Sequence, residues 1–168
     1  DGAIEDSTRA IELDPKQAIA WNNRGVARDK KGDLDGAIAD FTRAIELDPK
    51  FVGGWVNRGD KRKNKGDLDG AVADLTRALK LDPKQTQVWM TRGSVWVSKG
   101  EYERAIKDFT RGITLDPKLG DAWTNRADAK RNNGNLNGAF ADANRAIELD
   151  PTLKEAWNCR GTVRVAKG

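Results

Sequence analysis

Residues 18–51 read AIAWNNRGVARDKKGDLDGAIADFTRAIELDPKF, and the features of this stretch recur along the whole chain. Proline, tryptophan and glycine each return every 34 residues: at Pro15, Pro49, Pro83, Pro117 and Pro151, at Trp21, Trp55, Trp89, Trp123 and Trp157, and at Gly32, Gly66, Gly100, Gly134 and Gly168. A fixed period of this length indicates a protein built from stacked repeats, each packing on its neighbours.

Each 34-residue unit predicts two helices. The first runs from just before Trp21 to Gly32, and glycine suits a helix end that needs a left-handed residue. The second ends before Pro49, because the residue preceding a proline is pushed away from the helical region. Its apolar residues recur at spacings of three and four, which places on one helical face Ala37, Ile38, Phe41, Ala44 and Ile45.

The unit W-x-x-R-G, followed by A-x-x-x-F-x-x-A and then proline, resembles the tetratricopeptide repeat (TPR) family. The resemblance covers the whole chain and implies an all-α fold, a right-handed superhelical solenoid of antiparallel helix pairs. The chain departs from the family by placing arginine where many members have leucine before the glycine. We expect one array: a lone second helix at 1–17, full repeats at 18–51, 52–85, 86–119 and 120–153, and a lone first helix at 154–168.

Two charged positions recur with the repeat and lie near each other in an antiparallel helix pair. Arginine occupies the seventh position of each unit and aspartate the twenty-third. The sequence therefore predicts a partly buried, structural ion pair in each full repeat, which sets geometry more than it adds stability. The predicted pairs are Arg24–Asp40, Arg58–Asp74, Arg92–Asp108 and Arg126–Asp142.

Composition argues against catalysis. The chain has no histidine, the commonest general base and metal ligand, and its one cysteine, Cys159, cannot form an internal disulfide. We find no phosphate loop, metal-ligand spacing or catalytic triad, and therefore expect no enzyme and no cofactor. No apolar stretch reaches half of a membrane span. The Arg-Gly-Asp sequence at 58–60 falls inside a predicted helix, which argues against its use as an exposed recognition loop.

Charge is divided unequally between the two kinds of helix. The first-helix segments hold 18 of the 30 Lys and Arg residues but only 5 of the 26 Asp and Glu residues. Part of this excess is the recurring arginine. The remainder predicts a positive groove that attracts acidic ligands.

The resemblance implies that the first helices line a concave face that binds an extended peptide. Asparagines at the sixth position match a ladder that holds peptide backbone in the family, although Thr91 and Cys159 interrupt it. An apolar patch in the second and third units, with basic and amide neighbours, is expected to anchor a peptide side chain. The alternatives are solvated asparagines and a hydrophobic helix without a ligand. The candidate residues are Asn23, Val56, Asn57, Lys63, Met90, Val97, Asn125, Arg131 and Asn132.

The two ends of the chain are complementary halves of one repeat. This predicts either head-to-tail association or a piece of a longer TPR protein. The residues expected at an end-to-end interface are Ile4, Asp6, Ile11, Trp157, Arg160 and Val163. A further alternative is binding of single-stranded nucleic acid through the basic layer. It is weakened because the arginines have predicted carboxylate partners and only Trp96 lies outside the tryptophan packing positions.

Overall fold

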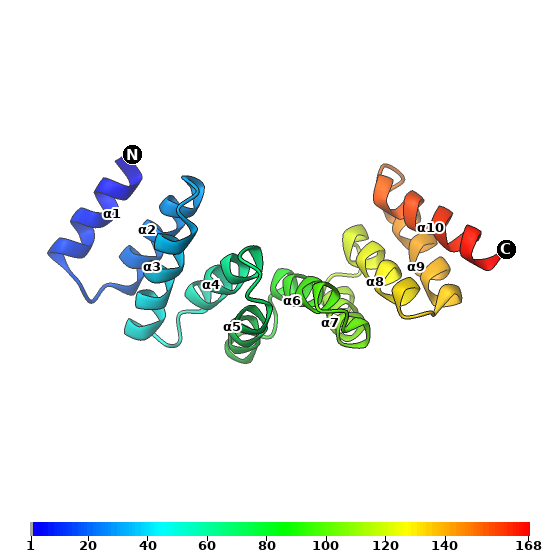
Figure 1. Ribbon diagram of the computed structural model, residues 1–168, viewed down its shortest axis with the longest axis horizontal. Coiled ribbons are helices and arrows are strands. Elements are labelled where there is room, and N and C mark those ends of the chain that lie inside the picture. Colours follow the sequence, from blue (N-terminus) through cyan, green and yellow to red (C-terminus); the bar gives the residue numbers. More distant parts are fainter. Residues whose placement is uncertain (1) are drawn as a thin grey trace. The chain divides into compact units, whose positions relative to one another are not determined.

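The computed structural model describes residues 2–168, and within them the chain forms α-helices and no strand (Figure 1). The helices are α1 (Gly2–Leu13), α2 (Ala18–Lys30), α3 (Leu34–Leu47), α4 (Val52–Asn64), α5 (Leu68–Leu81), α6 (Thr86–Ser98), α7 (Tyr102–Leu115), α8 (Gly120–Asn132), α9 (Leu136–Leu149) and α10 (Lys154–Lys167). Each full repeat supplies one pair, so the predicted all-α solenoid of helix pairs is confirmed.

The structure divides into two compact units, residues 1–83 and 84–168, and each is described by itself. Inside each unit successive helices pack on one another, and the first helices also contact each other directly: α2 with α4, α6 with α8, and α8 with α10. Each unit therefore presents a surface formed by first helices alone. We call it the first-helix face, made of α2 and α4 in the first unit and of α6, α8 and α10 in the second.

The helix ends follow from local sequence. Gly32 has a φ of 82°, in the left-handed region that glycine tolerates without steric cost, and it turns the chain between α2 and α3. Asp33 then caps α3, its side chain accepting a hydrogen bond of 2.9 Å from the Gly36 amide. The helix ends at Leu47, before the extended residue that precedes Pro49.

The recurring tryptophan and proline are hydrogen-bonded to each other, which explains why both recur every 34 residues. The indole nitrogen of Trp21 donates to the Pro15 carbonyl oxygen at 3.0 Å. The same bond joins Trp55 to Pro49 and Trp123 to Pro117. Each such bond ties a first helix to the loop that precedes it. In each repeat the indole ring also lies beneath the recurring arginine, as Trp21 does beneath Arg24 at 4.7 Å.

Close packing inside a helix pair depends on matched side-chain size. A Cβ atom added at Gly25 would lie 2.6 Å from the Phe41 ring, too close for any real contact. Gly93 has the same relation to Phe109. In the fourth repeat both positions are alanine, Ala127 with its partner at 143, and both are fully buried. The pair is thus built either from glycine with a large side chain or from two small ones.

All four predicted ion pairs are confirmed, and each is bidentate: the guanidinium donates two hydrogen bonds to the carboxylate. Nη2 of the arginine lies 2.7–2.8 Å from Oδ1 of the aspartate, while Nε donates to Oδ2. The aspartates are buried, at 2–4% exposure. The pairs are Arg24–Asp40, Arg58–Asp74, Arg92–Asp108 and Arg126–Asp142.

Three of the four aspartates accept a second cation from the next turn of the first helix. Arg28 binds Asp40, Arg62 binds Asp74 and Lys130 binds Asp142, at 2.7–2.9 Å. In the third repeat this position is Trp96, whose ring lies under the guanidinium of Arg104 at 4.7 Å.

The size matching can be tested in the first full repeat by copying into it the alanine pair of the fourth. We expect Phe41→Ala to lower the free energy of unfolding by about 3 kcal/mol, because it opens a cavity, and Gly25→Ala to lower it by about 1–3 kcal/mol through overpacking. The double variant copies the alanine pair of the fourth repeat and should lose less than the sum of the two. Urea unfolding measured for all four proteins checks this, and additive losses would contradict the size matching.

The buried carboxylates generate a second test. Asp142→Ala leaves Arg126 and Lys130 without their carboxylate, and we expect it to destabilise the protein by about 3 kcal/mol. Glu148→Ala on the same helix is the matched control, because Glu148 is an exposed partner of Arg145 and such pairs contribute little. Equal midpoints of chemical unfolding for the two variants would show that the buried pair does not hold the helices together.

Candidate functional site

Most basic side chains of the first helices that the structure describes have a carboxylate partner within the chain. The recurring arginines bind second-helix aspartates, and the hydrogen bonds that Arg24 donates to the Asp40 carboxylate raise the pKa of Arg24. Lys61 lies 2.8 Å from Asp29 and also contacts Asp60. Burial lowers the pKa of Lys61, but its hydrogen bonds with these two carboxylates outweigh that effect and raise it. The basic excess of the first helices is therefore largely a structural charge.

A cavity of about 230 Å³ opens on the first-helix face of the second unit. We call it the α6–α8 hollow; it is lined by Gln87, Met90, Leu119, Asp121, Thr124, Asn125 and Glu155. Its rim carries amides, which both donate and accept hydrogen bonds. Asp121 and Glu155 are exposed, and neither has a cationic partner in the described part of the chain. The hollow therefore offers a ligand exposed carboxylates without an ion-pair partner, together with amide groups.

A second cavity of about 250 Å³, the α8–α10 hollow, is lined by Asp128, Arg131, Glu155, Asn158, Cys159 and Thr162. Arg131 donates to the Thr162 hydroxyl at 3.2 Å and pairs with Asp128 at 3.1 Å. Its Nε atom is buried without a hydrogen-bond partner. Burial and the nearby Asp128 carboxylate raise the pKa of Cys159 to about 12. The thiol is therefore protonated at neutral pH and is a poor nucleophile.

The predicted peptide residues of the second unit are divided between surface and core. Asn125 lies exposed in the α6–α8 hollow, Arg131 lies in the α8–α10 hollow, and Asn132 is exposed at the end of α8. Val97 is partly buried against the core. Met90 also lines the α6–α8 hollow, but only 6% of its surface is exposed, so little of its side chain is open to a peptide.

The burial of Met90 has a local cause. Met90 packs in one cluster with Phe109 and Ile113. Its sulfur lies 2.8 Å from the position that a Cβ atom at Gly112 would take. The other repeats have alanine at the position of Gly112. The missing methyl group leaves room for the methionine side chain, and this glycine is the sequence signal that could have predicted it.

In the first unit the predicted residues are held differently. Asn57 donates from Nδ2 to Oδ1 of Asn22 at 2.9 Å, so one of its donors is already engaged between α2 and α4. Asn23 is exposed, while Val56 and Lys63 are partly buried. An asparagine ladder across this unit would therefore begin from a bonded pair rather than from free amides.

Sequence reasoning missed three polar residues of the second unit that share the second position of their repeats. They are Gln87, Asp121 and Glu155, and all three line the α6–α8 hollow. Their signal was the recurrence of a polar side chain at one position of three successive first helices. The sixth position, to which the prediction gave more weight, contributes only Asn125 to this hollow.

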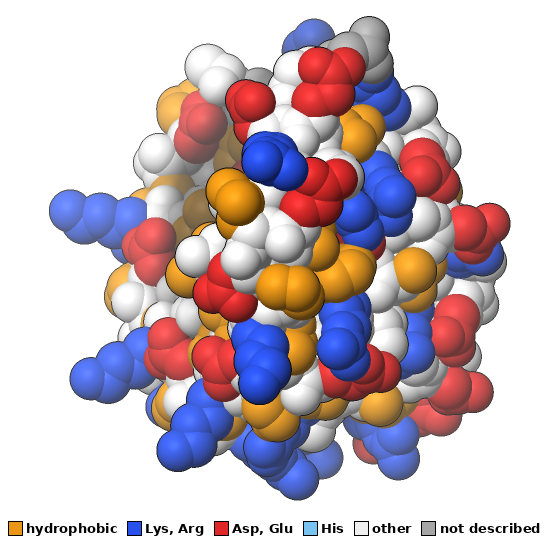
Figure 2. Space-filling view, turned by 90° about the vertical axis from the view of Figure 1, so that its left-hand side faces the viewer, with side chains coloured by type: hydrophobic (Ala, Val, Ile, Leu, Met, Phe, Trp, Pro, Cys, Tyr) orange, Lys and Arg blue, Asp and Glu red, His pale blue; other side chains and the backbone are white. Residues whose placement is uncertain are grey.

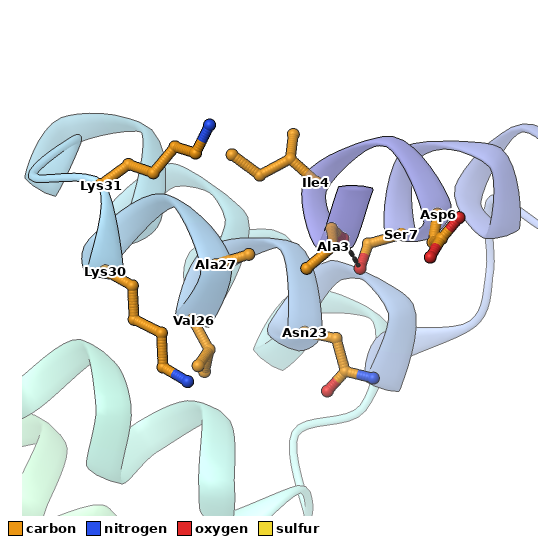
Figure 3. A pocket seen from close by; sticks show the side chains of 9 residues that line it. All are labelled: Ala3, Ile4, Asp6, Ser7, Asn23, Val26, Ala27, Lys30 and Lys31. Atoms are coloured by element: carbon orange, nitrogen blue, oxygen red, sulfur yellow. Dashed lines mark hydrogen bonds between the residues drawn. The ribbon is translucent and has the colours of Figure 1, made fainter. Parts of the chain in front are cut away.

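The predicted end-to-end residues also separate into surface and core. Figure 2 shows hydrophobic surface exposed among charged side chains at the α1 end. Ile4 and Asp6 line a hollow of about 540 Å³ between α1 and α2, which also holds Asn23 (Figure 3). Trp157 is 46% exposed. Arg160 lies over its ring at 4.3 Å and donates to Asn144 at 3.0 Å.

Ile11 and Val163 do not fit the predicted end-to-end interface. Ile11 is 8% exposed and Val163 is fully buried, packed with Ala127, Ala139 and Ala143. Because each helix of a solenoid packs on the neighbouring repeat as well as on its own partner, these two side chains are already covered inside the chain.

Residues 2–168 show neither a metal-ion cluster nor a membrane-spanning helix. That part of the chain contains no cluster of three or more Cys, Asp or Glu side chains arranged to hold a metal ion. None of its helices combines the length and the apolar character that a membrane crossing requires.

Solved structures share this architecture at low sequence identity. The crystal structure of MamA has a TM-score of 0.85 and 21% identity, with 89% of this chain and 88% of that chain covered. A tetratricopeptide repeat protein from Parabacteroides merdae has a TM-score of 0.86 and 21% identity, covering 99% of this chain and 66% of its own. The first TPR of Spaghetti (RPAP3), bound to the HSP90 peptide SRMEEVD, has a TM-score of 0.66 and 23% identity, covering 68% and 91%.

Sequence comparison gives the family. No curated protein matches the chain significantly. Two models of the tetratricopeptide repeat do match it, one over residues 18–51 and the other over residues 56–119 and 99–154. These matches extend over most of the chain and follow the helix pairs described above. The chain therefore belongs to the tetratricopeptide repeat family.

Proposed function

We propose that the chain is a non-catalytic protein-interaction scaffold that binds an extended peptide segment along its first-helix face. The observation that carries this proposal is the α6–α8 hollow, where side-chain amides and two open carboxylates face outward from three first helices. An extended peptide needs donors and acceptors for its backbone, and Gln87 and Asn125 supply both. The proposal draws support from a TPR of similar fold that was solved with a bound peptide.

The charges of this face lead us to revise the expected ligand. Pairing removes most of the basic excess from the surface, whereas Asp121 and Glu155 are open. A Lys or Arg side chain of the peptide suits these carboxylates better than an acidic one, because a carboxylate attracts a cation and repels another anion. We therefore propose a peptide with a basic residue at the α6–α8 hollow, while Arg131 in the neighbouring hollow suits an acceptor group of the peptide.

A second candidate function is self-association. It is favoured by one observation: Asp6 and Arg160 occupy the two positions that are joined in every full repeat, yet neither has an oppositely charged partner in the described part of the chain.

The recurring ion pairs also argue against the nucleic-acid alternative, since guanidinium groups that bind carboxylates are poorly placed to bind phosphates.

The peptide proposal is tested by selecting random linear peptides displayed on phage against the 168-residue chain. We expect the selected sequences to be enriched in Lys or Arg. The double variant Asn125→Ala with Glu155→Gln should weaken the binding of a selected peptide by about tenfold or more, measured by calorimetry, because it removes one amide contact and one charge.

Asn137→Ala with Glu148→Gln is the matched control. Both residues are exposed on α9, a second helix, and neither lines the α6–α8 hollow. This control should bind like the unchanged chain. Selection of no peptide, or equal affinity for the unchanged chain and the Asn125→Ala, Glu155→Gln variant, would overturn the proposal.

A further inference from the structure

The exposed face of α7 is more basic than the equivalent faces of α3 and α9. Arg104 stands where both of those helices have glycine, and Lys107 stands where both have alanine. Thr114 takes the place of a glutamate in both. Relative to α3 and α9, each of these three changes raises the positive charge of the face.

The cations of α7 form a row on its solvent side. The first three follow one another at spacings of three and four residues, which places them on one side of the helix. A fourth lies in the loop after α7, and all four are exposed. The buried residues of α7 pack instead against α6 and α8, the helices beside it in the second unit (Figure 1). We call the row the α7 stripe; it consists of Arg104, Lys107, Arg111 and Lys118.

The stripe lacks the neutralising carboxylate that the equivalent faces have. In α3 and α9 the recurring exposed arginine is bound by the glutamate three residues later, in the pairs Arg43–Glu46 at 3.0 Å and Arg145–Glu148 at 2.9 Å. In α7 that glutamate is Thr114, and Arg111 has no carboxylate partner in the described part of the chain. Lys107 has none there either, although Glu103 lies one turn before it.

The first cation of the stripe is held in place by another helix. The guanidinium of Arg104 lies 4.7 Å from the ring centre of Trp96, which is partly buried against the core from α6. Arg104 also lies 3.8 Å from the exposed Glu101, a weak contact at that distance and exposure. A side chain that is ordered before a partner arrives loses less conformational freedom on binding.

We propose that the α7 stripe is a second interaction surface and that it binds an acidic helix of a partner protein. The helical rise places the first three cations about 4.5 and 6 Å apart along the axis of α7. Carboxylates at positions i, i+3 and i+7 of another helix have the same spacing and lie on one face. Acidic side chains on one side of an extended chain are about 6.6 Å apart, so they match the row less well.

Two other polyanions suit the stripe less. Proteins that bind DNA through its phosphates make about 6–10 such contacts, and the stripe offers four cations. The neighbouring aromatic ring, Trp96, lies under Arg104 and does not offer a face on which a base could stack. A helix that lies in a membrane surface turns its apolar side to the lipid, whereas the apolar side of α7 is in the core.

The experiment titrates the ¹⁵N-labelled 168-residue chain at low salt with an alanine-rich helical peptide that carries glutamates along one face. An isomer of the same composition has its glutamates spread around the helix. We expect the first peptide to bind about tenfold more tightly than the isomer, with chemical-shift changes concentrated in α7 and the loop after it. Lys107→Glu with Arg111→Glu should weaken its binding by about tenfold or more, because two attractions become repulsions.

Arg145→Glu with Lys154→Glu is the matched control. It makes the same change in net charge at two exposed cations of the second unit that lie outside the stripe, and it should bind the peptide like the unchanged chain. Lys107→Gln with Arg111→Gln removes two charges without adding repulsion, and it should have an affinity between those of the unchanged chain and the charge-reversed variant. Thermal unfolding followed by circular dichroism checks that every variant is folded.

The outcomes separate the stripe from the peptide site of the first-helix face. No binding, shift changes outside α7, or equal weakening by the control variant would overturn the stripe as a binding surface. Tighter binding of oligothymidylate, or of vesicles of phosphatidylcholine and phosphatidylserine, to the same residues would overturn the acidic helix as its partner. The Asn125→Ala, Glu155→Gln variant should bind the acidic peptide like the unchanged chain, so failure of one site leaves the other standing.

Discussion

The buried aspartate at the twenty-third position of each repeat is the constraint on which the rest of the structure depends. A carboxylate at 2–4% exposure requires a charged hydrogen-bonding partner, and a guanidinium that approaches with two parallel bonds can satisfy it in only one orientation. That geometry fixes the relative position of the two helices of a pair. It also fixes the arginine over the tryptophan ring, and the tryptophan in turn bonds the preceding loop. Pair geometry, loop position and surface charge thus share one origin.

How much of this the sequence reveals depends on the kind of interaction. The helix pairs, the left-handed glycines and the four ion pairs could all be predicted, because each depends on residues at a fixed spacing within one repeat. The depth of a side chain could not be predicted in this way. Met90 is buried because Gly112 lacks a methyl group, and Val163 is buried because three alanines surround it. Burial depends on the volume of neighbours from other helices, which a repeat position alone does not specify.

The charge of the candidate site could not be predicted for a similar reason, because it depends on ion pairs between helices. Counting charges by segment predicts a basic face, yet the count cannot separate a cation that binds a buried carboxylate from one that faces a ligand. Once the paired groups are set aside, the open charges of the α6–α8 hollow are the carboxylates Asp121 and Glu155. Excess charge on a segment of a repeat protein is therefore a poor guide to its ligand until its internal partners are known.

The alternation between a glycine–phenylalanine contact and an alanine–alanine contact has a consequence for how such chains are recombined. A first helix with Gly25 or Gly93 leaves a void opposite a small second-helix residue, and one with Ala127 collides with a phenylalanine. Single helices are thus not interchangeable parts, although their sequences align without gaps. The smallest module that can be exchanged between repeats is therefore the intact helix pair. A consensus repeat that takes each position separately could combine alanine on the first helix with phenylalanine on the second, and these two residues do not pack together.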